Sequence, residues 1–152
     1  MNKEVNFETA KILKEKGFSW ECRHFYSKNK YDQEFYLRTG LEYDSDRDCI
    51  WDWNLNGGKS GMLLKTIPYP NDGTAIYYSA PIIEDVCMWL YEKHEIWIYL
   101  IPAEDNKKVF KPFFRGENIT DQHLTKFFES PTEAYEAAIK YTLEKLIQGG
   151  NK

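Results

Sequence analysis

The sequence predicts an α+β fold, in which an antiparallel sheet is packed by two long helices, with a short helix at the N-terminus. The strongest indication is the stretch 79–102, where the spacing of the apolar residues changes from helical to alternating. An apolar stripe over 80–93 predicts an amphipathic helix, and the alternation over 96–101 predicts a strand. Both faces of that strand are apolar, so we expect it to be central in the sheet and covered on both sides.

Capping residues indicate where the two long helices begin. Ser79 is the expected N-cap of the first, because its hydroxyl can accept a hydrogen bond from an N–H of the first turn. Ser130 and Glu133 have the spacing of a capping box, and Pro131 occupies the first helical position between them. The second long helix is therefore expected over 131–147.

The N-terminal part of the chain predicts one short helix and one hairpin. Asn6 and Gly17 are a suitable cap and stop for a helix over 7–16. Segments 20–27 and 34–39 alternate in polarity around a polar turn and predict two antiparallel strands.

Residues 41–75 are expected to form an irregular aromatic and acidic insert, because glycines and prolines interrupt most of this segment. Within it, 62–67 has the composition of a strand. Beyond the insert and the central strand, 108–115 is expected to return antiparallel, and 127–128 to add a short strand. Pro112 predicts that the returning strand lies at an edge of the sheet, because proline cannot donate to a ladder.

Length and composition favour a single globular domain over residues 1–152. Charged residues make up 29% of the chain and hydrophobic ones 42%, and the formal net charge is −4. This charge disfavours a globally electropositive nucleic-acid binder. Three cysteines without paired spacing predict no disulfide framework. We also expect no signal peptide, no membrane partner and a cytoplasmic location, because no apolar leader or long apolar run is present.

An acidic run resembles a calcium-binding loop but fails at two required positions. Asp44, Asp46 and Asp48 have the spacing of the first ligands of an EF-hand. The turn glycine is replaced by Cys49 and the bidentate glutamate by Leu55, so this loop is excluded.

Other motifs for catalysis or cofactors are equally incomplete. Gly58, Lys59 and Ser60 match the end of a phosphate-binding loop, but Trp53 stands where its first glycine is required. The cysteines and histidines lack the short paired spacing of a structural zinc site, and no motif orients a Cys–His pair. The sequence therefore predicts no catalytic residue, no cofactor and no metal.

Two segments are candidate binding surfaces. In the strand 108–115, alternation places Lys111, Phe113 and Arg115 on one face, and cations interleaved with aromatics are typical of single-stranded nucleic-acid binders. The alternative explanation is that the lysines and the proline protect an edge strand from pairing. In the insert, Trp51 and Trp53 lie beside the acidic run and are candidates for a protein partner.

Three segments resemble a group of small uncharacterised proteins of Bacteroidetes genomes, phages and prophages. They are the opening 7–18, the stretch 78–94 with the Ile-rich strand after it, and the ending 130–143. The resemblance covers the three helices and the central strand but not 41–75. It implies a shared fold and a phage-associated role, and it carries no activity and no catalytic residues.

The leading hypothesis from the sequence is a non-enzymatic accessory protein that binds another macromolecule, most simply a protein, through the insert. The alternative is a single-stranded nucleic-acid binder that uses Lys111, Phe113 and Arg115. The third hypothesis is a small-ligand enzyme, which requires a pocket with converging polar groups.

Overall fold

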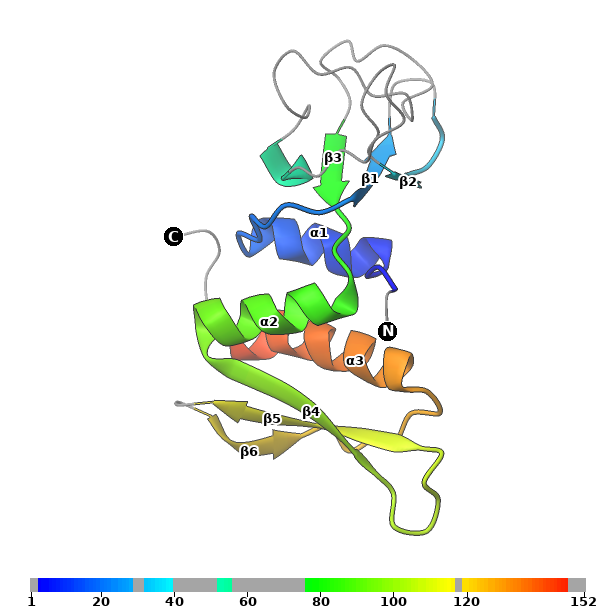
Figure 1. The fold of residues 1–152 in the computed structure, drawn as a ribbon, viewed down its shortest axis with the longest axis vertical. Helices are drawn as coiled ribbons and strands as arrows, with labels where there is room; N and C mark the ends of the chain where they lie inside the picture. The colour runs from blue at the N-terminus through cyan, green and yellow to red at the C-terminus, as the bar shows by residue number, and fades with distance from the viewer. Residues whose placement is uncertain (1–2, 29–31, 40–51, 56–75, 117–118, 148–152) are drawn as a thin grey trace. The chain divides into compact units, whose positions relative to one another are not determined.

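The computed structural model describes residues 3–28, 32–39, 52–55, 76–116 and 119–147 (Figure 1). The chain divides into two compact units, which are described one at a time. The N-terminal unit spans Asn6–Pro81, and the C-terminal unit spans Ile82–Gly150 together with Met1–Val5. That the whole chain acts as one domain stays a prediction.

The expected α+β class is confirmed, but the expectation of two long helices is wrong. The three α-helices of the described residues have 9, 12 and 11 residues. Both sheets are small, three-stranded and antiparallel. In chain order the elements are α1 (Phe7–Glu15), β1 (His24–Lys28), β2 (Tyr36–Thr39), the 3-10 turn η1 (Trp53–Leu55), β3 (Ile76–Ser79), α2 (Ile83–His94), β4 (Ile96–Pro102), β5 (Phe110–Gly116), β6 (Ile119–His123), α3 (Pro131–Tyr141) and the π-helical turn η2 (Thr142–Leu146).

The N-terminal unit contains α1 and a sheet of order β2-β1-β3. The expected short helix is present: the Asn6 side chain accepts a hydrogen bond from Thr9 N at 2.9 Å, and Gly17 follows the helix with φ 87°. The expected hairpin is present as well, since β1 pairs antiparallel with β2. The strand expected over 62–67 lies outside the described residues.

Side-chain hydrogen bonds fasten η1 to two separate segments of the N-terminal unit, the connection between α1 and β1 and the end of β3. The indole Nε1 of Trp53 donates to the carbonyl of Cys22 at 2.8 Å. Asn54 Nδ2 donates to the carbonyl of Phe18, and Asn54 Oδ1 accepts from Ser79 N, both at 2.9 Å. One amide side chain therefore connects the segment after α1 to the end of β3.

In the C-terminal unit, α2 and α3 pack on one face of a sheet of order β4-β5-β6 (Figure 1). Ile98 of β4 and Phe114 of β5 are buried on that face, and the Phe114 ring lies 5.3 Å from the Tyr141 ring, centroid to centroid. Gly116 pairs with Ile96, and an added Cβ there would lie 2.8 Å from the carbonyl oxygen of Glu95. Only glycine fits this close approach.

The positions of β4 and β5 in the sheet are the reverse of those expected. β4 is an edge strand and β5 is central, although β5 contains Pro112. In an antiparallel ladder the N–H and C=O of one residue point to the same side. The carbonyl of Pro112 accepts from Leu124 N, just after the last residue of β6. The missing N–H therefore faces the end of β6, and pairing with β4 is undisturbed.

The start of α2 also differs from the expectation. Ser79 is not its N-cap but the buried last residue of β3. Ile82 occupies the cap position without a side-chain hydrogen bond, and it forms an antiparallel bridge with Glu4. The N–H of Ile83 donates to the carbonyl of Lys3 at 3.0 Å. A backbone carbonyl thus satisfies one of the N–H groups of the first helical turn that have no partner within the helix.

The start of α3 is as expected, whereas its end is not. Ser130 accepts from Glu133 N at 3.1 Å, and Pro131 is the first helical residue. Regular α-helix ends at Tyr141, because the Thr142 hydroxyl donates to the carbonyl of Ala138 and a π-helical turn follows. The short strand expected at 127–128 is reduced to a bridge between Phe110 and Phe128.

We predict that Asn54→Ala lowers the free energy of unfolding by about 1–3 kcal/mol, because it leaves a carbonyl and an N–H without their partner. Urea denaturation followed by tryptophan fluorescence measures the change. The matched control is Asn106→Ala, which removes one hydrogen bond to Lys108 N in an exposed turn. It is expected to cost less than about 0.5 kcal/mol. Equal losses for the two variants would contradict the proposed anchoring of η1.

Candidate functional site

The sheet of the C-terminal unit has one face on which no described helix of that unit lies. Its register places three pairs of residues there, directly opposite each other across β4 and β5. The face is defined by six residues, Trp97, Tyr99, Ile101, Lys111, Phe113 and Arg115. The residues that alternate with them, among them Ile98 and Phe114, are buried on the helix side. We refer to this surface as the open face.

The open face exposes large apolar side chains. Trp97 is 46% exposed and Ile101 is 41% exposed, while Tyr99 and Phe113 are half-buried. The rings of Tyr99 and Phe113 are stacked across the strands, with centroids 5.6 Å apart and planes 22° apart. Exposed aromatic rings held by a rigid sheet indicate a contact surface rather than a core.

Two cations accompany this aromatic pair. Lys111 Nζ lies 6.0 Å from the ring centroid of Phe113 and 5.4 Å from that of Phe127. Arg115 is exposed on the next position of the same face. The β4–β5 turn adds no net charge, since Glu104 and Asp105 balance its lysines. Lys111 and Arg115 therefore supply the positive charge of the open face.

Two further exposed rings lie beside residues of the open face. Phe127 is 46% exposed and lies under the Lys111 ammonium group. Tyr91, on α2, is 50% exposed, and its ring contacts that of Trp97 edge to face at a centroid distance of 5.0 Å. The aromatic surface is thus larger than β5 by itself provides.

The five candidate binding residues predicted from the sequence lie in different environments in the structure. Lys111, Phe113 and Arg115 lie together on the open face, and whether they bind a ligand stays a prediction. Trp51 lies outside the described residues. Trp53 is fully buried, and its ring stacks on Phe25 at a centroid distance of 4.2 Å. Its ring is therefore not part of a surface that a partner can contact.

Trp97 and Tyr99 were not among the binding residues predicted from the sequence, because β4 was expected to be covered on both sides. A signal was present: the aromatic residues of β4 alternate with Ile96 and Ile98. Tyrosine and tryptophan on one face opposite aliphatic residues are typical of a surface that is apolar and in contact with solvent.

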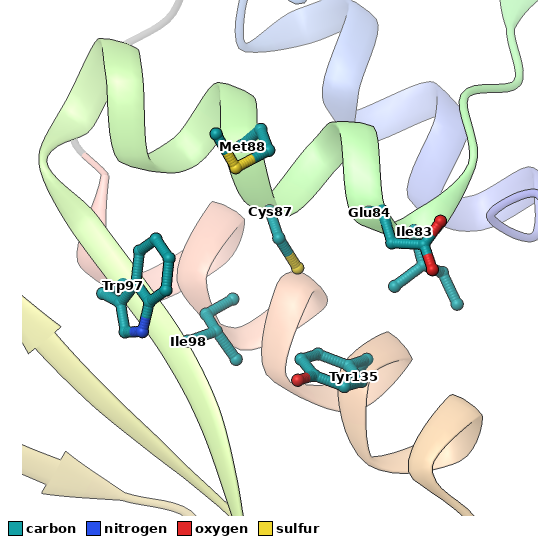
Figure 2. A pocket seen from close by; sticks show the side chains of 7 residues that line it. All are labelled: Ile83, Glu84, Cys87, Met88, Trp97, Ile98 and Tyr135. Atoms are coloured by element: carbon teal, nitrogen blue, oxygen red, sulfur yellow. The ribbon is translucent and has the colours of Figure 1, made fainter. Parts of the chain in front are cut away.

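A separate pocket of about 190 Å³ lies between α2, β4 and α3 (Figure 2). Its walls are mainly apolar, and three of its side chains carry polar groups of potential catalytic use, namely Glu84, Cys87 and Tyr135. The complete lining consists of Ile83, Glu84, Cys87, Met88, Trp97, Ile98 and Tyr135.

The pocket does not contain an activated nucleophile. Burial, together with the negative charge of Glu84, raises the pKa of the Cys87 thiol to about 12. Burial is also the main reason that the pKa of Tyr135 is raised, with smaller contributions from Cys87 and Glu84. Both groups are therefore protonated at neutral pH, whereas nucleophilic cysteine catalysis requires a thiolate.

In the N-terminal unit, burial lowers the pKa of Lys14 and raises that of Asp52, and each group partly offsets the shift of the other. Lys14 Nζ donates to the carbonyl of Tyr77 at 2.9 Å, and Asp52 Oδ1 accepts from Asn54 N at 3.1 Å. Both side chains thus bind backbone groups of their own unit, which is a structural role. Across the part of the chain that the structure describes, no group of three acidic, cysteine or histidine side chains is placed to hold a metal.

Comparison with protein families, with characterised proteins and with solved structures finds no match to this chain. Within the described ranges, no helix has the length and apolar character needed to cross a membrane.

We predict that Cys87 in the native protein reacts with iodoacetamide at pH 8 on the order of a thousandfold more slowly than an unperturbed thiol, because so little of it is thiolate. Peptide mass spectrometry after timed alkylation measures the rate. The same cysteine in urea-denatured protein is the control. Native labelling at the denatured rate would show that the thiol is not buried as described.

Proposed function

We propose that the protein is a non-enzymatic binding module that holds single-stranded nucleic acid on the open face. The observation that carries the proposal is the stacked pair Tyr99 and Phe113 with Lys111 and Arg115 on the same face. Aromatic rings for bases and cations for phosphates are the two components that such binders combine.

The aromatic rings are suited to bases because they are held by strands and are open to solvent at least in part, with Trp97 exposed and Tyr99 and Phe113 half-buried. Their positions are set by directly paired residues, Tyr99 with Phe113 and Trp97 with Arg115. Little conformational entropy is therefore lost when a base stacks on them. Stacking on a ring contributes about 1–3 kcal/mol for each base and depends little on sequence.

The arrangement of charge favours single strands over duplex DNA. Positive charge on the open face is limited to Lys111 and Arg115, and the chain as a whole has a formal net charge of −4. A duplex binder depends on many phosphate contacts and buries its bases in the helix. A single strand presents unstacked bases, which the rings can reach, and needs only a few phosphate contacts.

An accessory role in a phage or prophage, and action in the cytoplasm, are part of the proposal. The first rests on the resemblance described above, and the second on the three cysteines, which lack the paired spacing of a disulfide framework.

We predict that Phe113→Ala raises the Kd for a fluorescein-labelled oligo(dT) or oligo(U) of about 12 nucleotides by roughly fivefold to a hundredfold, because one stacking platform is lost. Fluorescence anisotropy at low salt measures the Kd. The matched control is Tyr36→Ala, which removes an exposed ring beneath the Arg38 guanidinium in the sheet of the N-terminal unit. It is expected to leave the Kd unchanged. An equal loss in both variants, or no binding by the native protein, would overturn the proposal.

Salt dependence tests the phosphate contacts separately. We predict that Lys111→Gln and Arg115→Gln each reduce the slope of log K against log salt by about 0.7, because each removes one phosphate contact to a single strand. Phe113→Ala should leave that slope unchanged. A native affinity that does not change with salt would exclude the assigned roles of the two cations.

Affinity purification of the tagged protein, with and without nuclease, separates the two kinds of macromolecular partner. Under this proposal, enrichment of nucleic acid disappears after nuclease treatment and is absent with Phe113→Ala. A protein that stays bound after nuclease and binds equally to Phe113→Ala would instead support a protein-interaction module. In that case the open face is not its binding surface.

A further inference from the structure

The pocket between α2, β4 and α3 has no role in the binding of nucleic acid proposed above. We propose that it binds a small organic cation whose apolar body is about the size of one aromatic ring. Three features of the pocket support this ligand, namely its volume, the single charge in its lining and the placement of its two aromatic rings.

The volume of the pocket sets the size of the ligand. At about 190 Å³ the pocket is well below the range of a site for a drug-sized molecule, roughly 300–1,000 Å³. It is slightly larger than an apolar cavity of about 150 Å³ that accepts benzene. A single ring with a short side chain, or an alkyl chain of similar volume, therefore matches the space.

The charge of the lining sets the sign of the ligand. Among the seven lining residues, Glu84 is the one with a formal charge. Its negative charge also contributes to the raised pKa values of Cys87, Tyr135 and the neighbouring Asp85. Since Cys87 and Tyr135 remain neutral, Glu84 supplies the charge of the lining, and its electrostatic field reaches both groups. This field attracts a cation and repels an anion.

The lining also gives the bound molecule an orientation. Figure 2 shows Tyr135 and Glu84 towards one end of the pocket and the Trp97 ring at the other, with the Cys87 thiol between them. The cationic group lies at the Tyr135 end, where the Glu84 carboxylate and the Tyr135 ring both favour it. The apolar body then packs against Met88, Ile98 and Trp97.

Nuclear magnetic resonance of methyl-labelled methionine tests this assignment directly. The chain has three methionines, and Met88 lines the pocket, so its signal can be assigned with Met88→Leu. The probes are 2-phenylethylammonium, the neutral 2-phenylethanol and the anionic 3-phenylpropionate, which share a ring and differ in charge. We expect the ammonium probe to shift the Met88 signal with a Kd on the order of millimolar.

The order of the three affinities is the decisive result. The ammonium probe should bind about three- to fivefold more tightly than the alcohol at low salt, because Glu84 is exposed and partly screened. The carboxylate probe should bind more weakly than the alcohol. No shift of Met88 with any probe, or equal affinity for all three, would overturn the proposal without the need for a variant.

A pair of variants assigns the preference to one carboxylate. Glu84→Gln should equalise the ammonium and alcohol affinities and leave the alcohol affinity unchanged. Glu92→Gln removes the same charge from an exposed position of α2 outside the pocket, and should keep the preference. Equal effects of the two variants would mean that general attraction to an acidic protein explains the preference.

The pocket and the open face can be tested independently, although Trp97 belongs to both. Glu84→Gln is expected to leave oligonucleotide binding unchanged, and Phe113→Ala to leave the probe affinities unchanged. Failure of either proposal is therefore recognised without reference to the other.

Discussion

The antiparallel register between β4 and β5 determines which side chains of the C-terminal unit form its core and which reach solvent. Seven residue pairs hold this register, from Ile96 with Gly116 to Pro102 with Phe110. A slip by one residue would turn every side chain to the opposite face. If β5 slipped, Phe113 would lie beneath the helices, on the opposite face from Tyr99, and Phe114 would be exposed. The close approach of Gly116 to the Glu95 carbonyl limits such a slip.

Both candidate sites depend on this register and on the helices that pack on one side of the sheet. The open face exists because α2 and α3 cover the side that carries Ile98 and Phe114. The pocket lies between the first two turns of α2, the start of β4 and α3, and α2 leads directly into β4. A residue with positive φ, Glu95 at 56°, makes this tight reversal. Because the connection between α2 and β4 is a single residue, Trp97 stays close to α2. It can therefore belong to the open face and also close one end of the pocket.

Local signals in the sequence predicted most elements, and the failures have particular causes. Asn6, Ser130 and Pro131 act through bonds to near neighbours, so their roles could be inferred without knowledge of the fold. The cap expected at Ser79 is absent because Ser79 pairs with the distant Phe25 as the last residue of β3, and a distant backbone pairs with the start of α2. Trp53 was expected at a surface, but its ring is buried and its indole N–H donates to the carbonyl of Cys22, thirty-one residues away in the sequence.

The sequence by itself determined the α+β class, the capped start of α3 and the shared face of Lys111, Phe113 and Arg115, because spacing and near-neighbour hydrogen bonds fix these features. Only the tertiary structure decided that β4 lies at the edge and that Trp97 and Tyr99 join that face. Alternation gives the two faces of a strand, but it does not say which strands lie beside it or which face the helices cover. Those choices depend on pairing between distant segments, which one strand's pattern does not encode.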